Sequence, residues 1–414
     1  MRKRTLSLIA LSLLSTMVCY GQKISGMWNG VMDAGDQTMS FIFKFAQNSN
    51  GESWCTLDCP EIDANDEPVK VVYNDADSVN IEIPMLQGSY AGRLADGEIK
   101  GKLLYAGVTF DINLKAGDLK VVRPQNPKLP LPYKTEEVTF VNAKDNNSFA
   151  GTLTYPMGYA KMVKSKVPVV LLVAGSRKDN RDAEAFRHKP FLVLADYLAR
   201  NGIASLRYDD RGVGGSQGDF ETVTTMTNME DAAAGLAYIR TLKKFGKVGV
   251  VGHSEGGTIS LMLAARGKAD FIVDMCGFAI RGDSVAIDQV KAKCDLHGMP
   301  DSVATQAIAD FEKMDSPWFR FAKTFNPADD IKAIKCPVMA IAGTKDYNVN
   351  PEHNQAVLKQ LLTPNSKNLI KKYEGLNHYL QHCTTGGEEE MVHITETISP
   401  EVLKDIVTWI NKMK

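Results

Sequence analysis

The segment that decides the fold prediction is Val251-Gly252-His253-Ser254-Glu255-Gly256-Gly257, VGHSEGG. It follows the apolar run 247–250 and precedes a helical pattern, so a strand is expected to turn sharply into a helix at Ser254. Such a turn needs residues with almost no side chain two positions before and after the serine, and Gly252 and Gly256 meet that need. The hydroxyl then lies at the positive end of a helix, where the next backbone N–H can bind a developing oxyanion. The pattern therefore predicts a nucleophilic serine.

The chain on both sides of this turn alternates strand and helix patterns. Apolar runs at 167–173, 203–208, 248–252 and 271–275 are separated by helical patterns at 191–200, 228–242 and 257–265. This alternation indicates right-handed crossovers and a mostly parallel sheet with helices on both faces, preceded by a hairpin at 138–155. Ligands in such folds bind at the carboxyl ends of the strands, which is where Ser254 lies. We expect an α/β-hydrolase fold over residues 136–414.

A serine hydroxyl needs a base, and the base needs a carboxylate that orients it. In α/β-hydrolases the acid and then the histidine follow the serine along the chain. Asp346 comes just after the apolar run 337–342 and is the preferred acid. The rival acids are Asp274, near the end of the preceding strand, and Asp329 or Asp330, which resemble helix-capping residues.

The base is expected in the loop after the last predicted strand, 368–373, and His378 fits this position best. The other histidines have weaker positions. His382 and His393 lie in a polar stretch typical of a surface, and His253 fills the variable position of the turn. His188 lies near the expected oxyanion loop, where either a contact with substrate or an ordinary polar surface position is open.

An oxyanion hole takes one N–H from the residue after the nucleophile and one from a loop after an early strand. These donors are expected at Glu255 and at Ser176, in the loop 174–177. The glycine-rich loop 207–216 lacks the spacing of a phosphate-binding loop, so its Asp209 and Arg211 are expected to be structural. The mechanism needs no metal or organic cofactor.

The N-terminal part of the chain has a different pattern. Residues 22–123 show alternating apolar and polar positions separated by Gly, Asn and Asp clusters, which predicts an antiparallel β-domain, either a meander or a small barrel. The proline-rich segment 124–135 is expected to be an extended linker. An insertion at 282–335, rich in helical patterns, can form a lid. Its aromatic side chains either line an acyl pocket or pack the lid onto the core: Trp318, Phe319, Phe321 and Phe325.

Residues 1–21 are expected to be a secretory signal, because Arg2-Lys3-Arg4 precedes a short apolar run and small residues. Cys19 offers a minor alternative, a lipid anchor. Without the three basic residues, 48 basic side chains become 45 against 49 acidic ones, a net charge of −4 that disfavours a nucleic-acid partner. Six cysteines remain, either free or paired, and the pair Cys55 and Cys59 lacks the second close pair of a zinc site. No stable membrane span is expected, and the oligomeric state stays open.

Several motifs in order resemble a bacterial family of secreted serine carboxylesterases with the α/β-hydrolase fold and an N-terminal β-domain. They are GHSEGG at 252–257, AGS at 174–176, RYDDRGVGGS at 207–216, CPVMAIAGTKD at 336–346 and GLNHYLQ at 375–381. The resemblance implies Ser254, Asp346 and His378 as a catalytic triad. One departure stands out, because the family usually has AGSG and this chain has Arg177 in place of the last glycine. Arg177 therefore becomes a candidate substrate contact. The alternatives are that it points into solvent or pairs with a neighbouring acid such as Asp179 or Asp182.

These inferences predict a serine carboxylic ester hydrolase that forms an acyl-enzyme from small or short-acyl esters, including acylated carbohydrates, in the periplasm or outside the cell. One alternative is a serine peptidase or aminoacyl amidase, since the same triad cleaves amides. A second alternative is an inert hydrolase-like protein that binds a glycan through its β-domain. Turnover of an aryl ester and of an aminoacyl amide with the same acyl group would distinguish the three.

Overall fold

The computed structural model describes residues 23–33 and 38–414. The chain divides into two compact units, one made of Met1–Pro60 and Ala64–Leu119 and the other of Glu61–Asp63 and Lys120–Lys414. The predicted signal peptide, with Cys19, lies outside the described residues. The division after Leu119 falls slightly before the domain end predicted at residue 123. Arg123 belongs to the second unit, where its guanidinium donates to backbone oxygens of that unit: Phe186, Arg187, Val392 and Ile394.

The first unit is a closed antiparallel barrel in which each strand pairs with the next and the last pairs with the first. Its interior is filled by buried side chains, as expected for eight strands, with Phe43 and Tyr90 among the largest. A Cβ at Gly101 would lie 2.4 Å from the Tyr90 hydroxyl, so this glycine leaves room for the ring. The sequence left a meander or a barrel open, and the structure is a barrel. Its strands are β1 Gly26–Asp33, β2 Thr38–Gln47, β3 Ser53–Cys59, β4 Ala64–Asn74, β5 Ser78–Ile83, β6 Gly88–Ala95, β7 Glu98–Tyr105 and β8 Val108–Ala116.

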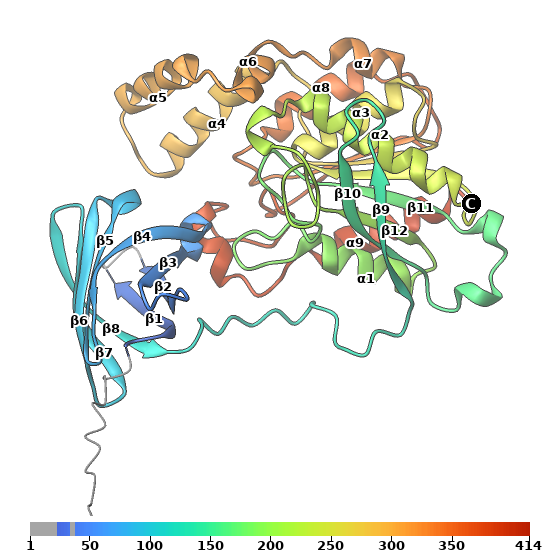
Figure 1. The fold of residues 1–414 in the computed structure, drawn as a ribbon. Coiled ribbons are helices and arrows are strands. Elements are labelled where there is room, and N and C mark those ends of the chain that lie inside the picture. The colour runs from blue at the N-terminus through green and yellow to red at the C-terminus, as the bar shows by residue number, and fades with distance from the viewer. Residues whose placement is uncertain (1–22, 34–37) are drawn as a thin grey trace, which may run out of the picture. The chain divides into compact units, whose positions relative to one another are not determined.

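The second unit is built on a mixed sheet in the order β16-β15-β14-β13-β11-β12-β10-β9. Figure 1 labels β9, β10, β11 and β12 of this sheet. The hairpin strands β9 and β10 are antiparallel to their neighbours, and the other pairs are parallel. The α/β-hydrolase fold predicted from the alternating pattern is confirmed. The strands are β9 Thr135–Val141, β10 Ser148–Thr154, β11 Val169–Val173, β12 Ala204–Tyr208, β13 Val248–His253, β14 Ile272–Met275, β15 Val338–Gly343 and β16 Leu369–Tyr373.

Helices cover both faces of this sheet, and each face has its own hydrophobic core. On one face, α2 (Thr225–Thr241), α3 (Glu255–Ala265) and α8 (Pro351–Leu361) contribute buried residues to a core with alternate strand residues such as Val169 and Leu171. On the other face, α1 (Pro190–Arg200) and α9 (Pro400–Asn411) pack on the intervening strand residues. The strands are therefore apolar on both sides, which is why they read as continuous apolar runs in the sequence.

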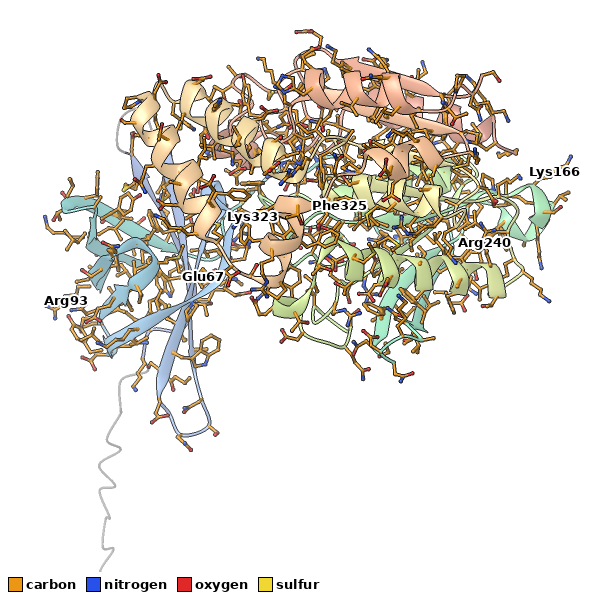
Figure 2. All side chains as sticks on the ribbon, turned by 90° about the horizontal axis from the view of Figure 1, so that it is seen from above. Glu67, Arg93, Lys166, Arg240, Lys323 and Phe325 are labelled. Carbon is orange, nitrogen blue, oxygen red and sulfur yellow. The ribbon has the colours of Figure 1, made fainter. Side chains whose placement is uncertain are left out.

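Between β14 and β15 the chain forms the helical insertion expected at 282–335. It consists of α4 Gly282–Leu296, α5 Asp301–Lys313, α6 Pro317–Thr324 and α7 Ala328–Ala333. Helix α5 has no buried residue, whereas Ile331 of α7 packs into the sheet core. Figure 2 labels Lys323 and Phe325 at the end of α6, where the Lys323 ammonium donates to the backbone oxygens of Glu312 and Met314 at 2.6 Å.

Short 3-10 helices complete the chain: η1 Pro60–Ile62, η2 Pro84–Leu86, η3 Tyr159–Lys161, η4 Lys164–Lys166, η5 Phe220–Thr222 and η6 Glu388–His393. The cysteines of the described residues are all free thiols, which answers the question of pairing that the sequence left open. Among the helices in the described part of the chain, none combines the length and the apolar character that crossing a membrane requires.

Candidate active site

The turn between β13 and α3 has the geometry that its glycines predict. Ser254 has φ +56° and ψ −123°, a backbone conformation that a residue with a side chain rarely adopts. A Cβ at Gly252 would lie 1.9 Å from the oxygen of Gly256, and one at Gly256 would lie 2.1 Å from the oxygen of Val173. Both contacts are with backbone atoms, which cannot move aside cheaply. The two glycines are therefore required for Ser254 to be held at the start of α3.

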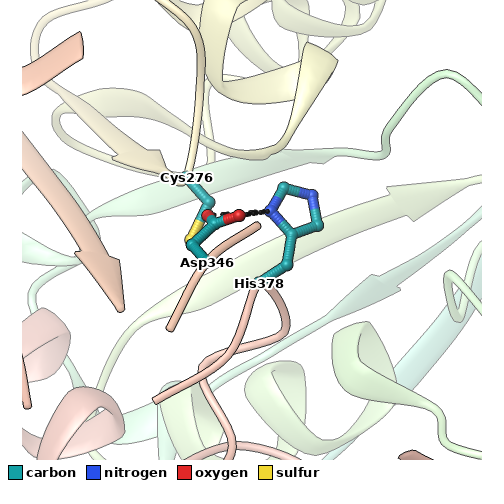
Figure 3. Close-up of side chains that lie close together, drawn as sticks. All are labelled: Cys276, Asp346 and His378. Carbon is teal, nitrogen blue, oxygen red and sulfur yellow. Dashed lines mark hydrogen bonds and ion pairs between the residues drawn. The ribbon is translucent and has the colours of Figure 1, made fainter. Parts of the chain in front are cut away.

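His378 and Asp346 form a buried hydrogen-bonded pair. The Nδ1 atom of His378 lies 2.9 Å from each carboxylate oxygen of Asp346 (Figure 3). Asp346 follows β15, and its Oδ1 also accepts hydrogen bonds from the backbone N–H groups of Asn348 at 3.0 Å and Val349 at 2.8 Å. These bonds hold the carboxylate in one orientation. An imidazole that donates from Nδ1 keeps Nε2 unprotonated and able to accept a proton.

The rival acids have other partners. Asp274 accepts a hydrogen bond from the Gly277 N–H at 2.8 Å, and complete burial raises its pKa to about 7. Asp329 and Asp330 lie on α7, where they pair with Lys332 and Arg266 respectively. Of the four carboxyl groups considered from the sequence, Asp346 is the one that the structure brings to His378.

Ser254 and His378 line the same pocket, which has a volume of about 610 Å³. The early loop predicted to supply an oxyanion donor lies against the serine, because a Cβ at Gly175 would be 3.4 Å from the Cβ of Ser254 and 3.9 Å from its Oγ. Ser176 and Glu255 also line the pocket. The structure thus brings together the five residues that the sequence assigned to the nucleophile, the base, the acid and the oxyanion hole.

The side chain of Glu255 makes contacts that the sequence did not suggest. Its carboxyl group is fully buried and accepts hydrogen bonds from the Thr225 hydroxyl and from the indole N–H of Trp318, the latter at 2.7 Å. Burial raises the pKa of this carboxyl. Trp318 is on α6 and lines the pocket, and its ring contacts Phe319 edge to face. The insertion is therefore tied to the residue that follows the candidate nucleophile.

Arg177 lines the pocket but its charge has partners in the second unit. Its guanidinium forms an ion pair with Asp63, lies 3.7 Å from Asp179 and donates to the Glu184 backbone oxygen at 3.2 Å. The pairing with Asp179 is one of the alternatives that the sequence left open. A negatively charged ligand at this position has to compete with two carboxylates.

His253 and the glycine-rich loop after β12 make structural contacts, and two further histidines lie on the surface. His253 is buried, its pKa is lowered to about 3 by burial first and by His378 second, and its Nε2–H donates to the His378 backbone oxygen at 2.9 Å. His382 and His393 are exposed, as expected. In the loop after β12, Asp209 binds the Arg181 guanidinium and Arg211 binds Asp231, which agrees with the structural roles expected there.

Both interpretations of His188 are wrong. Its imidazole is 2 % exposed, so it lies neither on the surface nor in the pocket. Nε2 lies 2.9 Å from the Met391 oxygen and Nδ1 lies 2.9 Å from the Thr397 hydroxyl. The residue connects the segment before α1 to the segment before α9. Its two partners lie about two hundred residues further along the chain, so no local sequence pattern could have indicated these contacts.

The chain is similar to known hydrolases. Residues 189–285, which include the serine turn, match the family described as Hydrolase_4, serine aminopeptidase S33. The chain is 27% identical over 324 residues to esterase EstD of Thermotoga maritima, covering 74% of this chain and 76% of that protein.

Two solved esterases are among the structures to which the chain is similar. An esterase from Pyrococcus furiosus has 16% identity and a TM-score of 0.47, with 71% of this chain and 99% of that chain covered. Est1E from Butyrivibrio proteoclasticus, solved with ferulic acid bound, has 20% identity and a TM-score of 0.46, with 67% and 100% covered.

A mixed sheet with helices on both faces, an insertion after β14 and a serine at the turn into α3 define an α/β-hydrolase. The likeness to the esterase EstD supports a carboxylesterase with this fold, and the chain carries an N-terminal β-barrel domain.

Proposed function

We propose that this enzyme hydrolyses small or short-acyl carboxylic esters through a Ser254-His378-Asp346 triad. The observation that carries the proposal is the bond between His378 Nδ1 and both Asp346 oxygens beside the pocket that Ser254 lines. Ser254 Oγ attacks the acyl carbon while His378 Nε2 takes its proton. The histidine then returns this proton to the leaving alcohol, and an acyl-enzyme remains. Water, activated by the same nitrogen, releases the acid and regenerates the serine.

The oxyanion of each tetrahedral intermediate is assigned to the backbone N–H groups of Ser176 and Glu255. Two observations support this assignment. Glu255 is the first residue of α3, so its N–H has no partner within the helix and lies at the positive end of the helix dipole. The loop of Ser176 approaches the serine closely, as the 3.4 Å distance from a Cβ at Gly175 shows. Oxyanion donors are worth about 2.7–4 kcal/mol each in related sites.

The reaction is tested by kcat/KM of Ser254→Ala and of the parent enzyme on p-nitrophenyl esters of graded chain length, together with acetylated and feruloylated sugars. We expect the parent enzyme to favour the short acyl groups and the alanine variant to lose about 10⁴-fold or more. Parent-like turnover by the alanine variant would remove Ser254 from the mechanism. Matched thermal unfolding of the two proteins is the control for folding.

A peptidase or aminoacyl amidase is the second candidate, and the family description of residues 189–285 favours it. The same triad cleaves amides, because His378 can protonate a leaving amine as it does an alcohol. A p-nitrophenyl ester and a p-nitroanilide with the same aminoacyl group distinguish the two candidates. The rates at which hydroxide hydrolyses the two compounds give the difference in their intrinsic reactivity. We expect the enzyme to favour the ester by well more than this difference. An amide preference would reverse the assignment.

The export of the enzyme to the periplasm or beyond is also a proposal, supported by the charged start and short apolar run of residues 1–18. Intact-mass analysis of protein recovered from its host should show a chain that begins at Gln22. A retained Met1 would contradict export by cleavage, and a lipid on Cys19 would show an anchored form.

A further inference from the structure

Cys276 occupies a strained position at the carboxyl end of β14. Its backbone has φ +59°, in the left-handed region that costs a residue with a side chain roughly 1–2 kcal/mol. Cys276 directly follows the last residue of β14, and its N–H still donates to the Ile341 oxygen of β15 at 2.8 Å. Glycine would occupy this position without strain, and the next residue is glycine. A non-glycine residue held in this way points to a use for its side chain.

The side chain of Cys276 lies against the acid of the candidate triad. Its Sγ, one carboxylate oxygen of Asp346 and Nδ1 of His378 all lie within 4.8 Å of one another, and all three residues are buried (Figure 3). The thiol interacts with the Asp346 carboxylate. Because an ionised carboxylate only accepts hydrogen bonds, a hydrogen bond between the two groups has the S–H as its donor.

The protonation state of the thiol suits this role. Burial, and next the negative charge of Asp346, raise the pKa of Cys276 well above its usual value, so the sulfur is protonated near neutral pH. Other titratable groups approach from the neighbouring strands. His253 on β13 is neutral near pH 7, and Asp274 on β14 binds the Gly277 N–H.

We propose that Cys276 is a positioning residue of the catalytic site, whose S–H donates to the Asp346 carboxylate and fixes its orientation toward His378. This inference rests on the proposed triad. The backbone N–H groups of Asn348 and Val349, in the loop after β15, both donate to Oδ1, whereas the thiol belongs to the residue that follows β14. The carboxylate is thus contacted from two separate segments of the chain. The thiol also withdraws part of the charge that would otherwise bind the imidazolium more tightly.

Removal of the thiol has two consequences. The carboxylate loses one restraint, so fewer enzyme molecules hold His378 in the productive orientation and kcat falls while KM stays nearly constant. The remaining charge on Asp346 is less dispersed, so the histidine holds its proton more strongly and the acidic limb of the pH profile of kcat/KM moves to higher pH.

The test compares Cys276→Ala, Cys276→Ser and Cys276→Gly with the parent enzyme. Cys55→Ala, a buried thiol in the barrel, is the matched control, and Ser254→Ala is the inactive reference. The alanine keeps Cβ and the strained backbone and removes only the thiol, whereas serine keeps a donor. The glycine variant relieves the strained φ and therefore folds even if the alanine variant does not.

We expect about a tenfold loss of kcat in the alanine and glycine variants, an acidic limb moved to higher pH, and activity within about threefold of the parent in the serine variant. Full activity in the alanine and glycine variants, with Ser254→Ala inactive, would overturn the role of Cys276 and leave the triad intact. Equal losses in the serine and alanine variants would show that sulfur packing matters instead of the hydrogen bond. Full activity in Ser254→Ala would contradict the proposed function itself.

Discussion

At the scale of single residues, the structure separates two buried carboxyl groups that the sequence placed in comparable positions. Asp346 and Asp274 both lie near the ends of neighbouring parallel strands. Asp346 binds the imidazole of His378, and Asp274 binds a backbone N–H and has its pKa raised to about 7. We expect Asp346→Asn to lose about 10³- to 10⁴-fold in kcat, because the asparagine favours the wrong tautomer of the histidine.

Asp274→Asn is the matched control, since its amide oxygen still accepts the bond from Gly277. It should change kcat by less than about threefold, because a neutral acceptor replaces a carboxyl that is itself largely neutral below pH 7. Steady-state kinetics of both variants on one aryl ester make the comparison. The reverse order of the two losses would assign the acid to Asp274.

Single residues also show which parts of the site could be predicted from the sequence. Ser254, Asp346, His378, Ser176 and Glu255 could be predicted as site residues because each lies at a strand end or at a turn that local patterns mark. Cys276, His253 and His188 were not assigned their contacts. Their partners come from other strands or from distant loops, so no spacing in the sequence records them. In the sequence, Cys276 looks like any other cysteine in an apolar segment. Its proximity to Asp346 is visible only in the folded structure.

At the scale of elements, a side chain of the insertion contacts the turn between β13 and α3. Trp318 of α6 donates to the buried Glu255 carboxyl and lines the pocket. The sequence predicted the helices of the insertion, because their apolar positions recur at helical spacing, and left open whether the aromatic residues line the pocket or pack the lid. For Trp318 the structure shows a pocket position, whereas Phe321 and Phe325 stack on each other.

We expect Trp318→Phe to raise KM several-fold for longer acyl groups and to leave kcat for acetyl esters nearly unchanged. Phenylalanine keeps an aromatic wall but loses the N–H donor, so α6 is held less firmly over the pocket and Glu255 loses a partner. Phe321→Leu, which changes the same helix away from Glu255, is the control. An equal effect of Trp318→Phe on short and long acyl groups would contradict a role for α6 in acyl binding.

At the scale of the whole molecule, buried histidines make the stability of the catalytic unit depend on pH. Burial first, and the nearby Arg123 second, lower the pKa of His188 to about 4. The unfolded chain binds a proton at this residue below about pH 6.5, whereas the folded chain does so only near pH 4. The stabilisation is therefore complete above pH 6.5 and is lost as the pH falls toward 4.

The measured quantity is the decrease in the free energy of unfolding between pH 7 and pH 5. We expect this decrease to be about 2 kcal/mol smaller in His188→Gln than in the parent protein. Glutamine can still hydrogen-bond to Met391 or Thr397 but has no proton to gain. Denaturant unfolding of both proteins at the two pH values measures the difference, with His382→Gln, an exposed histidine, as the control. Equal pH dependence in the parent and His188→Gln would show that this histidine takes up its proton without unfolding.

The fold class was predicted from the sequence because each buried strand is apolar on both faces and each helix has a regular spacing of apolar residues. The N-terminal unit was less determined. Alternating strands fit both a meander and a barrel, and the choice depends on the pairing of β1 with β8, which are about 80 residues apart. Closure of a barrel depends on the tilt and the register of all its strands together. A local sequence pattern does not carry this information.

Covalent labelling tests whether Ser254 is the nucleophile and His378 its base. The enzyme is treated with diethyl p-nitrophenyl phosphate, and the modified residue is located by peptide mass spectrometry while the release of p-nitrophenol is timed. We expect one adduct, on Ser254, and a labelling rate that falls about 10³-fold or more in His378→Ala at unchanged thermal stability. An adduct on another residue, or the same rate in His378→Ala, would contradict this assignment.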